Sequence, residues 1–88
     1  MHYNMAYEVL YNPRFEKSMN KLKKKDPPLY GRVKSKIGEI IENPEHFKPL
    51  RGVDAGKRRA HIGSFVIKYT IRENLIKILK FEHHDKAY

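Results

Sequence analysis

Three proline-containing pairs divide the first half of this 88-residue chain into two helical segments. Asn12 can cap a helix whose first position is Pro13, where the missing N–H of proline has no cost. Asp26-Pro27-Pro28 ends that helix and begins the next one, which stops before Asn43-Pro44. Apolar residues recur at helical spacing in both segments: Phe15, Met19 and Leu22, then Val33, Ile37, Ile40 and Ile41. The sequence therefore predicts two consecutive amphipathic helices.

Four segments have the composition of strands. The first is Ala6 to Tyr11, and the others are Lys57–Ile62, Phe65–Ile71 and Leu75–Glu82, joined by Gly63-Ser64 and Arg72-Glu73-Asn74. The order β-α-α-β-β-β predicts a small α+β protein with a single domain over residues 1–88. We expect the two N-terminal helices to pack on one face of an antiparallel sheet of about four strands. The loop from Glu45 to Gly56 is expected to lie against the sheet edge.

The chain is strongly basic, with 19 Lys and Arg against 10 Asp and Glu and a net charge of +9. Such a field favours nucleic acid, an anionic membrane or an acidic protein as partner. The absence of cysteine excludes disulfides and thiolate chemistry. No apolar run reaches membrane-spanning length, and we expect a cytoplasmic protein.

One predicted strand carries an unusual charge pattern. Because side chains alternate along a strand, Lys57, Arg59 and His61 share one face, whereas Arg58, Ala60 and Ile62 share the other. A sheet face with these cations suits the binding and polarisation of phosphate. Lys23 and Lys24 lie in a second basic run, which is either a solvated helix end or an RNA-backbone contact.

Four motifs in the second half carry a family resemblance: Leu50-Arg51-Gly52, Gly56-Lys57-Arg58-Arg59-Ala60-His61-Ile62-Gly63, Phe65-Val66-Ile67-Lys68-Tyr69 and His83-His84-Asp85-Lys86-Ala87-Tyr88. This series resembles the RelE/ParE toxin superfamily. Its members carry an L-K-G loop, a G-x-Y-R-V-R-I-G strand, a Y-R-V-I-Y strand and a terminal H-R-x-x-x-Y. The chain is most similar to the RelE-type mRNA interferase toxins of toxin–antitoxin systems.

The resemblance implies a ribosome-dependent mRNA endonuclease of a type II toxin–antitoxin system that acts in the ribosomal A site and inhibits translation. In that chemistry the 2′-hydroxyl attacks the adjacent phosphorus, which leaves a 2′,3′-cyclic phosphate and a free 5′-hydroxyl. It needs a base, an acid and cations for the phosphorane charge, with no metal and no cofactor. The implied protein partner is a cognate RelB-like antitoxin that forms a heteromer with the toxin.

The resemblance also assigns roles to residues. Arg59 and His61 stand at the two basic positions of the family strand, His84 stands at the arginine of H-R, and Tyr88 is the terminal tyrosine. These four are the candidate catalytic residues. The candidate RNA-binding residues are Lys57, Lys68, Arg51, Lys23 and Lys24.

Val66 departs from the family pattern, since active relatives have a catalytic arginine there. Lys68, two residues along, shares a face with Val66 and can supply a point charge, but not the bidentate fork of arginine. The alternative to this functional role is that Lys68 is simply a solvated strand residue.

Alternatives remain open. Adjacent strand residues point opposite ways, so only one of His83 and His84 is expected to reach the site, and the run is not expected to bind metal. A ParE-like toxin that inhibits DNA gyrase without nuclease activity is the alternative that Val66 favours, whereas the four catalytic candidates favour the nuclease. A plain RNA-binding domain is a third possibility.

Overall fold

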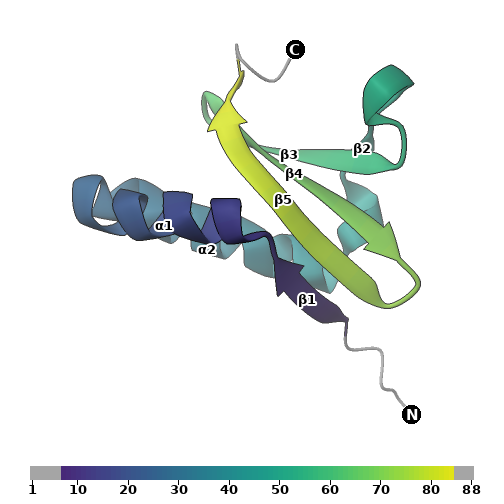
Figure 1. Cartoon of the computed structure of the whole chain (residues 1–88), viewed down its shortest axis with the longest axis horizontal. Coiled ribbons are helices and arrows are strands. Elements are labelled where there is room, and N and C mark those ends of the chain that lie inside the picture. The colour runs from purple at the N-terminus through teal and green to yellow at the C-terminus, as the bar shows by residue number, and fades with distance from the viewer. Residues whose placement is uncertain (1–6, 85–88) are drawn as a thin grey trace.

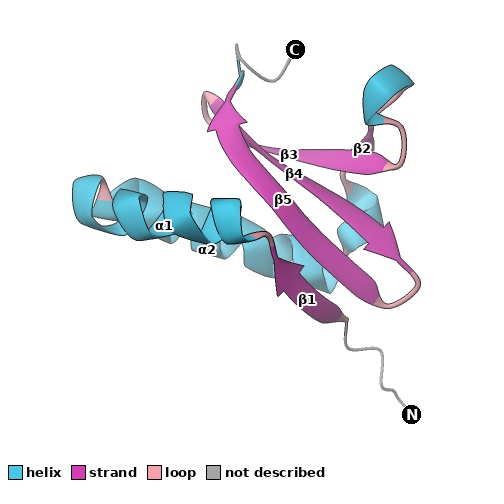
Figure 2. Cartoon of the chain, in the orientation of Figure 1, coloured by secondary structure: helices cyan, strands magenta, loops and turns pink. Residues whose placement is uncertain are grey.

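The computed structural model describes residues 7–84 of the protein (Figure 1). In chain order, the elements are β1 (Glu8–Tyr11), α1 (Pro13–Lys25), α2 (Pro27–Glu42), the 3-10 turn η1 (Pro44–His46), β2 (Lys48–Pro49), the 3-10 turn η2 (Gly52–Asp54), β3 (Lys57–Ile62), β4 (Phe65–Arg72) and β5 (Leu75–His83). The strands form one sheet in the order β1-β5-β4-β3-β2, and the helices lie side by side against it (Figure 2). No helix in the described part of the chain is long and apolar enough to cross a membrane.

Side-chain caps set the helix boundaries that the sequence predicts. The Asn12 side chain accepts a hydrogen bond of 2.8 Å from the Arg14 N–H. Asp26 serves both helices, because its backbone N–H donates to the Leu22 carbonyl while its carboxylate accepts from the Leu29 N–H at 3.2 Å. A single residue between the helices makes the turn tight, so α1 and α2 pack against each other.

The predicted α+β architecture is confirmed, and the sheet differs from the prediction in two details. The edge strand β1 pairs parallel with β5, so the sheet is mixed rather than antiparallel. The other edge has a fifth strand, β2, whose Lys48 and Pro49 pair antiparallel with Arg59 and Arg58. The loop after α2 thus lies at the sheet edge as expected. A two-residue strand that contains proline has no alternating pattern to reveal it.

Both helices cover one face of the sheet. Apolar side chains of the two helices pack against those of β3, β4 and β5, and form the core: Phe15, Met19, Leu29, Val33, Ile37, Ile40, Ala60, Ile62, Ile67, Tyr69, Ile76 and Ile78. The buried Tyr69 hydroxyl donates to the Pro44 carbonyl at 2.5 Å, and burial raises the pKa of Tyr69 to about 12. This bond fixes η1 against the core. Within residues 7–84 no α-helix covers the opposite side of the sheet, and we call that side the open face.

A β-bulge decides which side chains of β5 reach the open face. Lys68 of β4 is opposite Lys80, but the next residue, Tyr69, is opposite Ile78, so Leu79 is the extra residue. Ile76 and Ile78 face the helices, and strict alternation would send Glu82 to the same side. The bulge reverses that alternation, and Glu82 lies instead beside Lys68 on the open face.

Candidate functional site

The open face gathers the basic residues of β3 and β4. Arg59 is opposite Lys68 in the register, and His61 is opposite Val66. Arg58 points the other way, because its guanidinium donates to the carbonyls of Glu45 at 3.0 Å and Phe47 at 2.7 Å. The alternation predicted for this strand is therefore confirmed, with Lys57, Arg59 and His61 on the open face.

Two histidines meet at the end of this face. The rings of His61 and His84 lie 5.2 Å apart, although they come from β3 and from the end of β5. His83 instead packs edge-on against Phe65, also at 5.2 Å. The prediction that only one histidine of the pair reaches the site is confirmed.

The surroundings of His61 favour its neutral form. Partial removal from water is the largest cause, and the neighbouring Arg59, His84 and Lys48 add to it, so that the pKa of His61 lies below its usual 6.5. A neutral imidazole can accept a proton near pH 7. His61 is thus suited to act as a general base.

Asp54 and Glu82 place two carboxylates among the cations of the open face. The Asp54 carboxylate lies 3.3 Å from the Nζ of both Lys57 and Lys68, and these hydrogen bonds lower the pKa of Asp54. Glu82 lies 3.5 Å from the Lys68 Nζ and 3.7 Å from that of Lys80. Lys68 is only 4% exposed, so the interpretation of Lys68 as a solvated strand residue is wrong. Any contact of Lys68 with phosphate has to compete with two carboxylates.

Val66 occupies the position of the family arginine at the centre of this face. Its register partners are His61 on one side and Glu82 on the other. The residue is fully buried although it lies on the side away from the helices. A valine here contributes no charge to this end of the face.

The remaining candidates lie elsewhere. Arg51 is exposed in the loop between β2 and η2, and Lys23 and Lys24 are exposed in the last turn of α1, in the helical layer. Tyr88 lies outside the described residues. The structure therefore groups Lys57, Arg59, His61, Lys68 and His84, and it leaves the lysines of α1 apart from them.

Sequence reasoning missed Lys48, Asp54 and Glu82. Lys48 faces Arg59 from β2 and contributes to the low pKa of His61. The adjacent apolar pair Ile78-Leu79 interrupts the alternation of β5, and it is a signal that could have placed Glu82 on the open face. In residues 7–84 no three acidic or histidine side chains gather in a way that could hold a metal ion.

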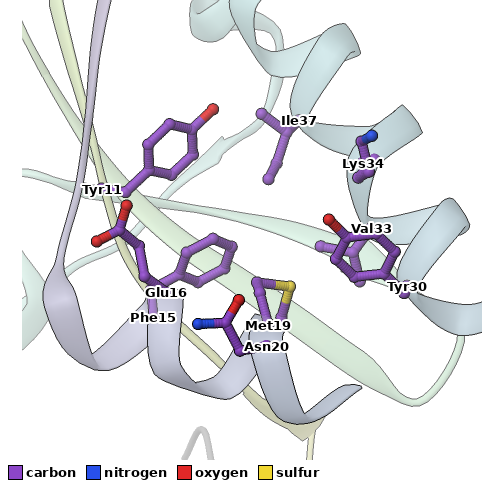
Figure 3. Close-up of a pocket in the computed structure, with 9 residues that line it drawn as sticks. All are labelled: Tyr11, Phe15, Glu16, Met19, Asn20, Tyr30, Val33, Lys34 and Ile37. Atoms are coloured by element: carbon purple, nitrogen blue, oxygen red, sulfur yellow. The ribbon is translucent and has the colours of Figure 1, made fainter. Parts of the chain in front are cut away.

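A cavity lies in the helical layer, apart from the open face. Figure 3 shows side chains of α1 and α2 that face each other across a cavity of about 410 Å³. Phe15 and Met19 line it from α1, and Val33 and Ile37 from α2. Glu16 and Lys34 stand at its rim, so the cavity has an apolar floor and a charged border.

Comparison with known proteins identifies the family. Residues 9–88 match the sequence model of the ParE toxin of the type II toxin–antitoxin system parDE. The chain is 36% identical over 85 residues to a Methanocaldococcus jannaschii protein assigned as toxin RelE4, with 93% of this chain and 90% of that protein covered. It is also 29% identical over 85 residues to an uncharacterised protein of Methanosarcina mazei, of which 99% is covered.

Solved structures share the fold. A chain of the toxin–antitoxin complex RelBE2 from Mycobacterium tuberculosis superposes with a TM-score of 0.76 at 26% identity, over 89% of this chain and 98% of that one. The YoeB/ParE toxin of Agrobacterium tumefaciens has a TM-score of 0.77 at 13% identity, over 88% and 98% of the two chains. The family match spans nearly the whole sequence and agrees with the motifs of β3, β4 and the C-terminal segment. The chain belongs to the ParE toxin family and is a type II toxin of the RelE/ParE superfamily.

Proposed function

We propose that this toxin is a ribosome-dependent mRNA endonuclease that cleaves by metal-free attack of the 2′-hydroxyl. The observation that carries the proposal is the pairing of His61 with His84 at the end of the cationic open face, beside Arg59. A base, an acid and a fixed cation at one end of a face are the groups that this transesterification needs.

The chemistry assigns a role to each group. His61, whose pKa is low, takes the proton of the 2′-hydroxyl as its oxygen attacks phosphorus. Arg59, which is 7% exposed, stabilises the negative charge that the phosphorane develops. His84 or Tyr88 gives a proton to the 5′-oxygen as the P–O bond breaks. Lys57 and Arg51 hold the RNA backbone, and Lys68 keeps Asp54 and Glu82 from repelling it.

Gyrase inhibition without nuclease activity is the second candidate, and two observations favour it. Val66 replaces the arginine that active nucleases of the superfamily carry, and the matching family model is that of the ParE toxin. Arg59, His61 and His84 have no assigned role in that activity, so we place it second.

One pair of assays separates the two activities. Purified toxin is added to a translating extract, where mRNA cleavage is mapped, and to gyrase, where supercoiling is followed. The nuclease predicts cuts within codons that need translating ribosomes, with supercoiling unchanged. If gyrase loses its supercoiling activity while the mRNA stays intact, the protein is a gyrase inhibitor and the nuclease proposal is refuted.

An antitoxin is the protein partner that we propose, of the RelB-like kind. The similar RelBE2 structure of Mycobacterium tuberculosis is a toxin–antitoxin complex. In this chain an acidic segment with an apolar face matches the cavity between α1 and α2, whose floor is apolar (Figure 3). The last turn of α1 adds the basic residues Lys23, Lys24 and Lys25. The cytoplasm, where ribosomes and nascent antitoxin occur, is the proposed location.

The partner proposal is tested by coexpression with the short acidic reading frame that neighbours a toxin gene. We expect a stable heteromer and a loss of toxicity. Substituting Tyr11, a cavity-lining residue that is 38% exposed, with Ser should weaken the heteromer far more than Lys21→Gln on the exposed side of α1. Equal affinities of the two variants would place the antitoxin elsewhere.

A further inference from the structure

A groove next to His61 extends the basic surface beyond the open face. It has a volume of about 630 Å³ and lies between α2 and the last residues of β3, with Arg32, Ser35, Lys36, Glu39, His61 and Gly63 among its lining residues. The groove exists because β2 pairs only with Arg58 and Arg59, so no strand formed by residues 7–84 lies beside β3 on that side from Ala60 onward. His61 belongs to both surfaces, since it lines the groove and contacts His84.

Arg32 is the cation that reaches into this groove. Its guanidinium lies beside the β3–β4 turn, with one nitrogen 3.2 Å from the place where a Cβ on Gly63 would be. Gly63 has a φ of +57°, a conformation that glycine adopts without strain, and its missing side chain leaves room for Arg32. Gly63 is two residues from His61, so their Cα atoms are at most about 7 Å apart. Such a distance is comparable with the spacing of successive phosphates in an extended RNA strand.

The other charged residues of the groove leave Arg32 available to bind an anion. Lys36 is paired with Glu39 at 3.4 Å and lies over the Phe47 ring at 5.7 Å. Arg32 forms no ion pair with another residue of the described chain. Ser35, one turn further along α2, adds a hydroxyl donor on the same helix face. Glu39 lies about 10 Å along the helix from Arg32, which leaves the end near His61 positive.

We propose that this groove binds the RNA phosphate next to the scissile one, with Arg32 as its principal ligand. The inference rests on the proposed nuclease function and adds a backbone subsite to it. RNA would then pass from the open face around the free edge of β3 to α2. Arg32 is a positioning residue here, because it holds the strand and takes no part in the proton transfers at His61 and His84.

The subsite is tested by binding of short RNA to the full-length toxin, without ribosomes. Fluorescent oligonucleotides with 2′-O-methyl groups resist cleavage, and each member of the series has a single neutral methylphosphonate at a different linkage. Arg32→Gln should weaken binding of the all-phosphate RNA by roughly five- to tenfold. The slope of log affinity against log salt should fall by about 0.7, the value for one phosphate contact on a single strand. Arg32→Lys should recover part of the loss.

The coupling between protein and RNA variants is decisive. Arg59→Gln should lose its effect at one methylphosphonate position, which marks the scissile linkage. At the neighbouring methylphosphonate position, Arg32→Gln should cause no further loss of binding. Lys34→Gln on the same helix is the matched control, because Lys34 lines the cavity on the other side of α2 and should change binding by less than about twofold. Arg32 and Lys34 are both exposed, and thermal melting checks that the two variant proteins are folded.

Three outcomes overturn the subsite: equal losses for Arg32→Gln and Lys34→Gln, a loss of the same size at every methylphosphonate position, or no binding of short RNA. The cleavage assay on ribosomes separates this result from the proposed function. If the toxin cleaves mRNA but Arg32 shows no coupling to one linkage, the subsite proposal alone is refuted. If the coupling is found but the toxin does not cleave mRNA, the subsite proposal stands and the nuclease proposal is refuted.

Discussion

The adjacent arginines of β3 provide a sharp test of the site, because the strand sends them to opposite faces. Arg59 lies on the open face with His61, whereas Arg58 holds η1 through the carbonyls of Glu45 and Phe47. We predict that Arg59→Ala lowers single-turnover mRNA cleavage by about a hundred- to thousandfold, the cost of one preorganised transition-state contact. Arg58→Ala should leave the cleavage rate within a few-fold of the wild type.

Arg58→Ala, which should have little effect on cleavage, should have the larger effect on stability. A hydrogen bond from a charged group contributes about 1.5–3 kcal/mol, and the bond to the exposed Glu45 carbonyl contributes less than the bond to Phe47. Arg58→Ala should therefore lower the free energy of unfolding by about 2–3 kcal/mol. In a protein of this size the melting temperature then falls by at least about 8 °C.

The assay compares the two variants by thermal and chemical unfolding and by single-turnover cleavage at saturating toxin on stalled ribosomes. Equal losses of cleavage in both variants would mean that bulk charge, not a placed guanidinium, drives the reaction. A stable Arg58→Ala protein with lost cleavage would refute the assignment of faces.

Three further predictions test other parts of the account. Lys68→Met should lower the free energy of unfolding by about 1–3 kcal/mol, because Asp54 and Glu82 lose a buried partner and each keeps one lysine. The cleavage rate should stay within a few-fold of the wild type. A loss of cleavage as large as that of Arg59→Ala would give Lys68 the role of the missing arginine, and adding Val66→Arg should then restore cleavage. On the acid side, the cleavage rate should rise with pH through a midpoint below 6.5, because the active base is neutral His61 and its pKa is lowered. A midpoint above 6.5, or the same limb in His61→Gln, would exclude this base. Tyr69→Phe should cost about 1–3 kcal/mol in chemical unfolding, because the Pro44 carbonyl loses its buried donor; an unchanged midpoint would mean that this carbonyl finds another partner.

Local chemistry made much of the fold predictable. The Asn12-Pro13 and Asp26-Pro27 pairs give the helix starts, and the alternation from Lys57 to Ile62 gives both the strand and the face of each side chain. These features depend on neighbours within a few residues, which is the range over which capping and alternation act.

Long-range pairing was not predictable in the same way. The parallel pairing of β1 with β5 joins segments at opposite ends of the chain. The carboxylate of Asp54 contacts Lys68 across 14 residues, and Arg32 approaches Gly63 from a different layer of the fold. No local pattern encodes such contacts, because they form only when the whole sheet and both helices are assembled.

The bulge in β5 shows how one residue can change a site. His84 was predicted by its motif to join His61, yet alternation from the buried Ile76 and Ile78 would send it toward the helices. The extra residue, Leu79, reverses the alternation and brings the two histidines together. Deleting Leu79 would shift the register and separate them.

The chemistry of the cut ends tests the central claim most directly. Toxin is added to translating ribosomes in the presence and absence of excess chelator, and the 3′ ends of the mRNA fragments are identified. The account predicts a 2′,3′-cyclic phosphate opposite a free 5′-hydroxyl, in equal yield with and without chelator, and loss of these ends in His61→Gln. Fragments with 3′-hydroxyl ends, or cleavage that chelator abolishes and added divalent metal restores, would contradict it.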